Sequence, residues 1–270
     1  MIEIKSKKIG AELISINFNG EEKLHDGISF WNRHSPVLFP IVGKLKNGET
    51  IIENQVCRMG QHGFARDMEF EEVGEDSYLL RYNENTLEKF PYKFELYICY
   101  ETTDDSVTTK YKIKNIDDRN IMFGLGAHPA FRCNYENCEL EFDKDESELK
   151  IYQLEDGLVK DVPEDKSSFI DENKIKLHKN IFDNDAIILK DLSSKAVTLK
   201  ENNEKILEFD FNDFPYLGIW SKPGANFLCI EPWFNTADKV SSDGKFENKE
   251  DLINLSPKGV FECKYTVKFF

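Results

Sequence analysis

The stretch of sequence that decides the fold is YKFELYICYE, residues 92–101, which is followed closely by VTTKYKIK, residues 107–114. In both segments apolar residues occupy every second position, and mostly polar residues lie between them. LEFDFN, residues 207–212, and FECKYTVKF, residues 261–269, repeat the pattern. A period of two with one apolar face is typical of antiparallel strands that pack on a core on one side.

Turn signals support this interpretation. Four dipeptides suit tight turns with positive φ: Asn19-Gly20, Asn47-Gly48, Asp156-Gly157 and Asp243-Gly244. Helical patterns are few and short, at residues 85–90 before Pro91 and at residues 247–254. The sequence therefore predicts an all-β protein, a large antiparallel β-sandwich with a few short helices.

No linker rich in Gly, Ser or Pro divides the 270 residues, and no segment repeats at a fixed period. The most polar stretch, residues 143–180, still carries apolar residues, so we expect a single domain over residues 1–270. The chain has no run of about 18 apolar residues, and its N-terminus lacks the apolar region of a signal peptide. Neither a membrane span nor export is predicted.

The chain carries 35 Lys and Arg against 50 Asp and Glu, a formal net charge of −15. Such a surface repels phosphate backbones and anionic membranes, which argues against nucleic acid or a membrane as a partner. The six cysteines are scattered without a CxxC pair. Without an export signal, they are expected to be reduced thiols in a cytoplasmic protein.

Three stretches interrupt the strand patterns by placing glycine or proline beside titratable or aromatic residues. They are QHGFARD at 61–67, GAHPAFR at 126–132 and IEPWFNTADK at 230–239, with FDNDAIIL at 182–189 as a weaker fourth. These interruptions are the candidate positions for chemistry.

The two histidines in these stretches each have two interpretations. Pro129 favours an extended backbone and ends strand pairing, so His128 is expected at a strand end, where a general acid or base is useful. A hydrogen-bonded histidine at the rim of the sheet is the alternative. His62 lies between two nearby glycines, and it is either a site residue or a loop histidine that caps a turn.

Glu231 follows an apolar run that is expected to form a buried strand. Loss of hydration there raises the pKa of a carboxyl group towards the range of a useful base. A structural salt bridge to Arg66 or Lys239 is the alternative. Trp220 and Trp233 offer flat apolar faces to a sugar, although most tryptophans fill cores.

Other chemistries are less well supported. The five histidines form no HxH or HExxH motif, so no metal site is predicted. There is no GxSxG motif, no Walker loop and no GxGxxG between a strand and a helix. Acid–base chemistry without a cofactor remains.

The motifs of the sequence, taken together, resemble those of a known family. HGFARDMEF, FPYKFEL, GAHPAFR and IEPWFNTAD, in that order, are similar to motifs of the aldose 1-epimerase (galactose mutarotase-like) family, and RHSPVLFPIVGKLKNG fits its bacterial LacX-like branch. The motifs span roughly residues 31–239. The resemblance implies a galactose mutarotase-like sandwich with a sugar cleft and no cofactor.

The resemblance also implies roles for individual residues. Glu231 takes the proton of the anomeric hydroxyl, His128 acts as the acid at the ring oxygen, and His62 holds the sugar. The substrate-binding aspartate falls on Asp185, with Asp183 as the alternative.

The family's site arginine falls in a loop that here reads Gly43-Lys44-Leu45-Lys46-Asn47. A lysine lacks the planar fork of an arginine. Arg33 or Arg66 can therefore fill the place of the arginine. Lys44, which occupies the position in the loop, and Trp233 are further candidates for contact with the substrate.

The leading functional hypothesis is an aldose 1-epimerase that interconverts the α and β anomers of a free aldose such as galactose or glucose. One alternative is a hexose 6-phosphate mutarotase that uses a cationic patch of Arg33, Lys44, Lys46 and Arg66. Another is a non-catalytic sugar-binding or regulatory protein on the same fold. The expected partner is a monosaccharide, and the chain is expected to be a monomer or a homodimer.

Overall fold

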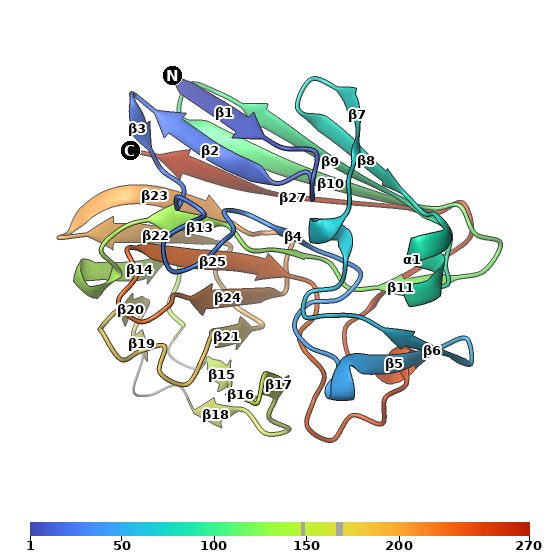
Figure 1. Cartoon of the computed structure of the whole chain (residues 1–270). Helices are drawn as coiled ribbons and strands as arrows, with labels where there is room; N and C mark the ends of the chain where they lie inside the picture. Colours follow the sequence, from blue (N-terminus) through green and yellow to red (C-terminus); the bar gives the residue numbers. More distant parts are fainter. Residues whose placement is uncertain (147–148, 166–169) are drawn as a thin grey trace.

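The structure, a computed structural model, describes residues 1–146, 149–165 and 170–270. Its longest strands are β9 (Phe94–Thr102), β10 (Ser106–Asn115) and β27 (Val260–Phe269). They lie side by side near the centre of a ten-stranded antiparallel sheet (Figure 1). The segments with the clearest alternation in the sequence therefore form the central strands of this sheet.

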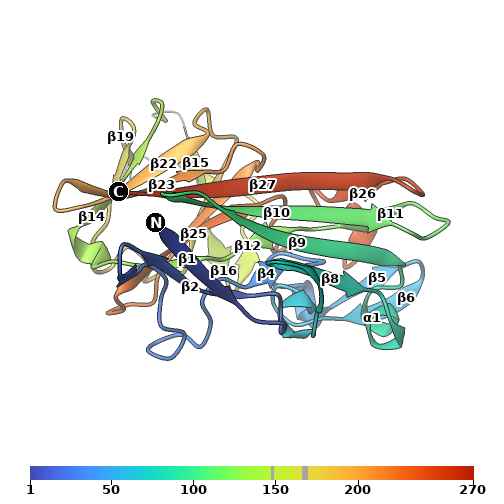
Figure 2. The same ribbon diagram turned by 90° about the horizontal axis from the view of Figure 1, so that it is seen from above.

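Figure 1 labels all ten strands of this sheet, and Figure 2 shows β27, β10, β9 and β8 side by side. The order of the ten strands runs from one edge of the sheet to the other. It is β19 (Ile170–Asp171), β20 (Lys174–Lys176), β14 (Cys138–Phe142), β22 (Ala196–Glu201), β23 (Glu204–Asp210), β27, β10, β9, β8 (Ser77–Arg81) and β7 (Glu71–Gly74). Along β10 the predicted alternation holds, because every second residue from Val107 to Asn115 is buried and the residues between them are partly exposed.

A second antiparallel sheet of eight strands carries the candidate site. Its order is β18 (Glu164–Asp165), β15 (Lys150–Tyr152), β21 (Ile187–Lys190), β24 (Tyr216–Trp220), β25 (Phe227–Trp233), β12 (Gly126–Ala127) and β4 (Val37–Leu38), and β13 (Ala130–Arg132) also pairs with β25. Every residue of β25 is buried. A strand that is covered on both faces carries a continuous apolar run instead of an alternation.

The two sheets pack face to face through aromatic side chains. Phe131 of β13 contacts Phe209 of β23 and Phe269 of β27, with ring centroids 6.0 and 6.4 Å apart. A small sheet of β1 (Ile2–Ser6), β2 (Leu13–Phe18) and β3 (Glu21–Glu22) packs beside them, and its Phe18 lies 6.0 Å from Phe269. The predicted large antiparallel β-sandwich is confirmed.

Three short strand pairs complete the sheets: β5 (Glu49–Ile52) with β6 (Gln55–Arg58), β11 (Ile121–Phe123) with β26 (Ile253–Leu255), and β16 (Leu154–Glu155) with β17 (Leu158–Val159). Both residues of Asn19-Gly20, Asn47-Gly48 and Asp156-Gly157 have positive φ, as predicted. At Asp243-Gly244 only the glycine does, with φ of 78°.

The helices are short: α1 (Glu84–Lys89) and the 3-10 turns η1 (Lys46–Gly48), η2 (Ala65–Asp67), η3 (Tyr135–Asn137) and η4 (Phe246–Asn248). The helix expected over residues 85–90 is confirmed as α1, which Asn83 caps by accepting the Thr86 N–H. The helix expected over residues 247–254 is wrong, because only the turn η4 forms there. Ile253 instead begins β26, which pairs with β11, and it packs against the core.

The six cysteines are free thiols, and five of them are buried. Among the described residues, no helix combines the length and the apolar character that a membrane crossing requires.

Candidate active site

A cleft of about 580 Å³ opens beside β24 and β25. A volume of this size is typical of small-molecule sites. The residues singled out in the sequence that line it are Arg33, His62, Arg66, His128, Asp185, Trp220, Glu231 and Trp233. Three interruptions of the strand pattern, together with the FDNDAIIL segment, therefore meet in one place.

The pairing of strands explains how His128 reaches Glu231. Both β12 and β13 pair with β25, with Gly126 opposite Trp233 and Ala130 opposite Cys229. His128 lies in the gap between these two short strands, beside the part of β25 that carries Glu231. The His128 Nε2 and Glu231 Oε2 atoms are 3.3 Å apart, and both side chains are buried.

Glycines allow Trp233 to lie flat against the neighbouring strands. A Cβ at Gly126 would lie 2.7 Å from the indole, and one at Gly218 of β24 would lie 2.6 Å from it. The Trp233 side chain packs in a buried apolar cluster and also forms part of the wall of the cleft. Its indole N–H faces the Glu231 carboxylate closely enough to lower the pKa of that group.

His62 is held in one tautomer by Gly43. The Gly43 N–H donates to His62 Nδ1 at 3.1 Å, and the His62 N–H donates back to the Gly43 carbonyl at 2.8 Å. In the neutral ring the proton is therefore on Nε2, which makes that atom a donor. His62 has φ of 67°, and its ring meets the His128 ring edge-on with centroids 5.6 Å apart.

Burial raises the pKa of Glu231 and lowers the pKa values of His128 and His62. Desolvation first, and then the nearby Asp185 charge, raise the pKa of Glu231 well above its ordinary 4.5. Desolvation, followed by the positive charge of Arg66, lowers the pKa of His128 to about 3. Desolvation and the neighbouring His128 also hold the pKa of His62 well below 6.5. These shifts favour a protonated Glu231 and neutral histidines.

Polar atoms without partners gather in this cleft. Eight buried side-chain polar atoms lack a hydrogen-bond partner among the described residues, and four of them belong to residues that line it. These four are Arg66 Nε, His128 Nδ1, Glu231 Oε2 and Trp233 Nε1. Glu231 Oε2 lies at ion-pair distance from His128 Nε2, and Trp233 Nε1 faces the Glu231 carboxylate, so these groups neighbour one another without completing regular hydrogen bonds. Because buried polar groups are normally paired, this concentration indicates a surface that binds a polar ligand.

The alternative of a structural salt bridge at Glu231 finds no support. Lys239 pairs with Glu250 at 2.6 Å, and the Arg66 guanidinium donates to the Gln61 carbonyl at 2.8 Å. Among the described residues, His128 is the one group at ion-pair distance from Glu231.

Some predicted site residues lie outside the cleft. Lys44 and Asp183 line an adjoining cavity of about 500 Å³, where Lys44 Nζ donates to the Asp156 carbonyl at 3.1 Å. Lys46 Nζ donates to the Ser242 carbonyl at 2.9 Å. Asp185 lines both cavities. Of the two alternative aspartates, the structure therefore brings Asp185 to the cleft.

Two of the cations that line the cleft are arginines. Arg33 donates to Asp67 at 2.8 Å and still lines the cleft, and Arg66 lies beside it. Both charges lower the pKa values of His62 and His128, so both lie close to the two imidazoles. Arg33 and Arg66 are therefore placed to contact a ligand in the cleft, whereas Lys44 and Lys46 point to backbone carbonyls elsewhere.

Reasoning from sequence did not single out Trp31 and Lys222, which line the cleft, or Cys229, which lies close to His128 and Glu231. Trp31 lies in HDGISFWNRH, residues 25–34, where glycine and aromatic residues stand beside charges as in the other interruptions. That signal could have found it. Lys222 and Cys229 carry no such signal.

In the described part of the chain, one group of side chains has the spacing to hold a metal ion. Donor atoms of His128, Cys229 and Glu231 all lie within 4.8 Å of one another. However, burial raises the pKa of Cys229 well above 9, which opposes the thiolate that a metal requires. The Cys229 side chain also packs in an apolar cluster with Ala130 and Phe227. We assign no metal to this group.

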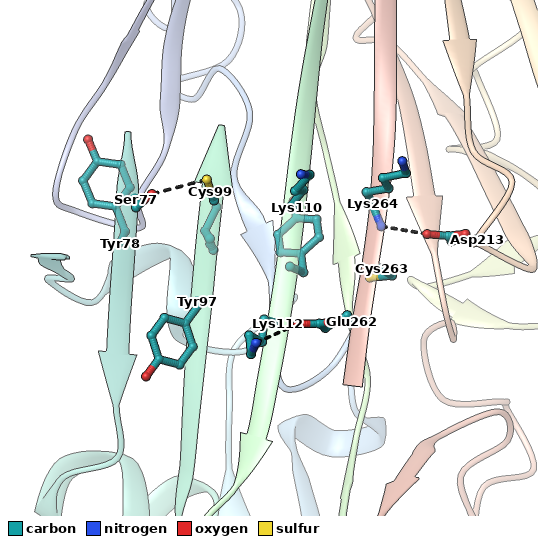
Figure 3. Close-up of a pocket in the computed structure, with 12 residues that line it drawn as sticks. Ser77, Tyr78, Tyr97, Cys99, Lys110, Lys112, Asp213, Glu262, Cys263 and Lys264 are labelled. Carbon is teal, nitrogen blue, oxygen red and sulfur yellow. Dashed lines mark hydrogen bonds and ion pairs between the residues drawn. The ribbon is translucent and has the colours of Figure 1, made fainter. Parts of the chain in front are cut away.

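A second cavity of about 510 Å³ lies on the ten-stranded sheet, lined by β8, β9, β10 and β27 (Figure 3). The acidic groups of its lining, Asp213 and Glu262, both have partners. Lys112 contacts Glu262 at 2.7 Å, and the Lys264 N–H donates to Asp213 at 2.9 Å. None of the eight unpartnered polar atoms belongs to its lining. The candidate site is therefore the cleft beside β25.

The fold is similar to that of solved galactose mutarotase-like proteins. The galactose mutarotase-like protein from Lactobacillus casei superposes with a TM-score of 0.93 at 28% identity, covering 100% of this chain and 97% of that one. The galactose mutarotase related enzyme from Lactobacillus acidophilus gives 0.90 at 30% identity, covering 100% and 95%. By its fold the chain is therefore a galactose mutarotase-like protein.

The chain belongs to the aldose 1-epimerase family, whose model matches residues 2–252. The plasmid protein LacX of Lactococcus lactis is 32% identical over 288 aligned residues, which cover 98% of this chain and 96% of that protein. The resemblance seen in the motifs is confirmed over nearly the whole chain. This family is one of isomerases.

Proposed function

We propose that the protein is an aldose 1-epimerase that interconverts the α and β anomers of a free aldose such as galactose or glucose. The observation that carries the proposal is the His128–Glu231 pair, two buried groups 3.3 Å apart in a cleft of suitable size. Family membership supports the same reaction type.

The proposed reaction opens and closes the sugar ring. The Glu231 carboxylate takes the proton of the anomeric hydroxyl, while protonated His128 gives a proton to the ring oxygen, and the C1–O5 bond breaks. The aldehyde then rotates about the C1–C2 bond. Glu231 returns its proton to the aldehyde oxygen, His128 takes one from the O5 hydroxyl, and the ring closes as the other anomer.

The pair carries one proton throughout this cycle. Glu231 carboxylate with protonated His128 is the form that opens the ring, and protonated Glu231 with neutral His128 is the form that faces the aldehyde. Burial favours the second form, so the cleft stabilises the state that accompanies the open chain. The two forms differ only by transfer of a proton between two atoms 3.3 Å apart.

Binding of the sugar falls to the remaining cleft residues. His62 Nε2 donates to a sugar oxygen, and Arg66, with its unpartnered Nε, donates to another. Asp185 accepts from a hydroxyl, and the faces of Trp220 and Trp233 pack against the C–H groups of the ring. No cofactor takes part in this scheme.

The rate should depend on pH as the single shared proton requires. We expect no step near 6.5, the ordinary pKa of histidine, because the pKa of His128 is lowered to about 3. As the pH rises through the raised pKa of Glu231, the pair loses its proton and the rate falls. A pH profile of kcat/KM with one inflection at 4.5 and another at 6.5 would contradict this assignment.

The two aspartates of the FDNDAIIL segment allow a matched comparison. Asp185→Asn should raise KM by about tenfold, the loss expected for one hydrogen bond to a bound hydroxyl. Asp183→Asn should leave KM unchanged, since Asp183 lines only the adjoining cavity. Initial rates at varied sugar concentration give both values. Equal effects of the two changes would refute the assignment of Asp185.

Polarimetry tests the proposed function directly. Freshly dissolved α-galactose or α-glucose should change its optical rotation faster with the protein than in buffer alone. Unchanged rates on every aldose tried would overturn the proposal. Saturable sugar binding by calorimetry without faster exchange would then favour a non-catalytic sugar-binding protein.

One observation favours a second candidate, a mutarotase for a phosphorylated hexose. Arg33, Arg66 and Lys222 all line the cleft, although the whole chain has a net charge of −15. Of the patch expected from sequence, Lys44 and Lys46 lie elsewhere. A higher kcat/KM on glucose 6-phosphate than on glucose would select this candidate over the free aldose.

A further inference from the structure

His128 is enclosed by rings on three sides. The Trp31 indole packs on its face, with centroids 4.6 Å apart and planes at 31°. Trp220 and His62 meet it edge-on, at 5.7 and 5.6 Å. Glu231 approaches its Nε2 atom. Trp31 is the one member of this set that comes from the loop between β3 and β4.

That loop is fixed in an unfavourable backbone conformation. Phe30 has φ of 68°, which is rare for a bulky side chain. The Lys222 ammonium donates to the Phe30 carbonyl at 3.0 Å. His25 Nε2 lies 2.9 Å from the Trp31 carbonyl.

The start of the loop is held as well. The Asp26 carboxylate accepts the N–H groups of Ile28 and Ser29 at 2.9 and 2.8 Å. Strained residues that are held by several contacts are typical of functional sites, where the strain places a side chain that a relaxed loop would not.

We propose that Trp31 is a positioning residue for the reaction, which fixes the imidazole of His128 against Glu231 and excludes water from its exposed face. This inference rests on the proposed function for its kinetic consequence. Its structural content, the covering of His128, can be measured without activity.

The physical argument follows from the contacts. The indole covers a face of the imidazole that would otherwise open to the cleft, and desolvation is the largest cause of the lowered pKa of His128. Removing the indole hydrates the ring and frees it to rotate away from Glu231. Because proton transfer needs heavy atoms within hydrogen-bond distance, a looser ring slows the reaction.

Other groups around His128 stay in place in this argument. Arg33 on the same loop and Arg66 near His62 lower its pKa by their charge. Glu231 and Cys229 on β25 lie within 4.8 Å of its donor atoms. Because these groups are common to all the variants below, a change in the titration of His128 reports the loss of the indole.

The experiment compares Trp31→Ala with Trp31→Phe and with Ile28→Ala. Ile28 lies on the same loop and is 85% exposed, so it serves as a matched control. The pKa of His128 is measured by NMR titration of the imidazole, and kcat and KM are measured by anomer exchange. Trp31→Leu replaces Trp31→Ala if the alanine variant does not fold.

In Trp31→Ala we expect the pKa of His128 to rise from about 3 towards 6.5 and kcat to fall by about ten- to a hundredfold, with a smaller change in KM. Trp31→Phe should recover most of both values, and Ile28→Ala should match the wild type. An unchanged pKa of His128 in Trp31→Ala, whatever the rate, would overturn the proposal. A wild-type protein without exchange activity would refute the proposed function and leave the titration test standing.

Discussion

Glu231→Gln is expected to slow anomer exchange by about three orders of magnitude, the middle of the usual range for loss of a general base. The amide keeps the size of the side chain and its place on β25, where it remains opposite Gly218. It cannot accept the anomeric proton. Exchange rates by polarimetry or NMR measure the effect, and a rate within a few-fold of wild type would remove Glu231 from the mechanism.

The same change should stabilise the protein at neutral pH. Because the folded-state pKa of Glu231 lies above 4.5, the folded protein binds a proton that the unfolded chain releases. The free energy of unfolding therefore falls as the pH rises from 4.5 through the raised pKa. Glutamine carries no such penalty, so Glu231→Gln should melt at a higher temperature at pH 7 and show little difference near pH 4.

A matched control separates this effect from a general loss of charge. Glu88 is exposed on α1 and has no salt bridge among the described residues. Glu88→Gln should change neither the exchange rate nor the melting temperature. A melting temperature that rises equally in both variants would contradict the burial argument.

His128→Gln is expected to produce a loss of similar size, about 10²- to 10⁴-fold in kcat. The glutamine amide can still donate a hydrogen bond, but it cannot transfer a proton to the ring oxygen. The double variant with Glu231→Gln should be little slower than the slower single variant, because residues that act as a unit lose their function together.

Additive losses would contradict this account. If the fold-loss of kcat in the double variant equals the product of the two single losses, Glu231 and His128 act independently. The hypothesis that they share one proton would then be wrong. A His128→Gln variant with normal kcat and raised KM would instead make His128 a binding residue. Circular dichroism of each variant verifies that the β-sandwich is intact.

Local pattern predicted the strands well because period-two alternation reports directly which face is buried. It failed at residues 247–254, where a helical pattern lost to the pairing of Ile253 with Phe123 on β11. That partner lies 130 positions away in the chain, so no local signal reveals it. Tertiary pairing overrides weak helical propensity in short segments.

The candidate site shows the same limit. His128 and Glu231 were identified from proline, glycine and apolar context, yet their approach to 3.3 Å depends on two short strands that pair with one. Lys44 was expected in the cleft from its motif position, whereas its chain points to the carbonyl of Asp156 on the hairpin of β16 and β17. The direction of a long side chain depends on neighbours that the sequence does not reveal.

The central claim is that one buried proton shared by His128 and Glu231 drives anomer exchange. NMR exchange spectroscopy at equilibrium tests it most directly, with galactose, glucose and glucose 6-phosphate each mixed with wild type and with Glu231→Gln. The account predicts exchange between the α and β signals of at least one sugar with wild type, and a loss of about three orders of magnitude in the variant. Absence of enzyme-dependent exchange for all three sugars, or equal exchange with both proteins, would contradict it.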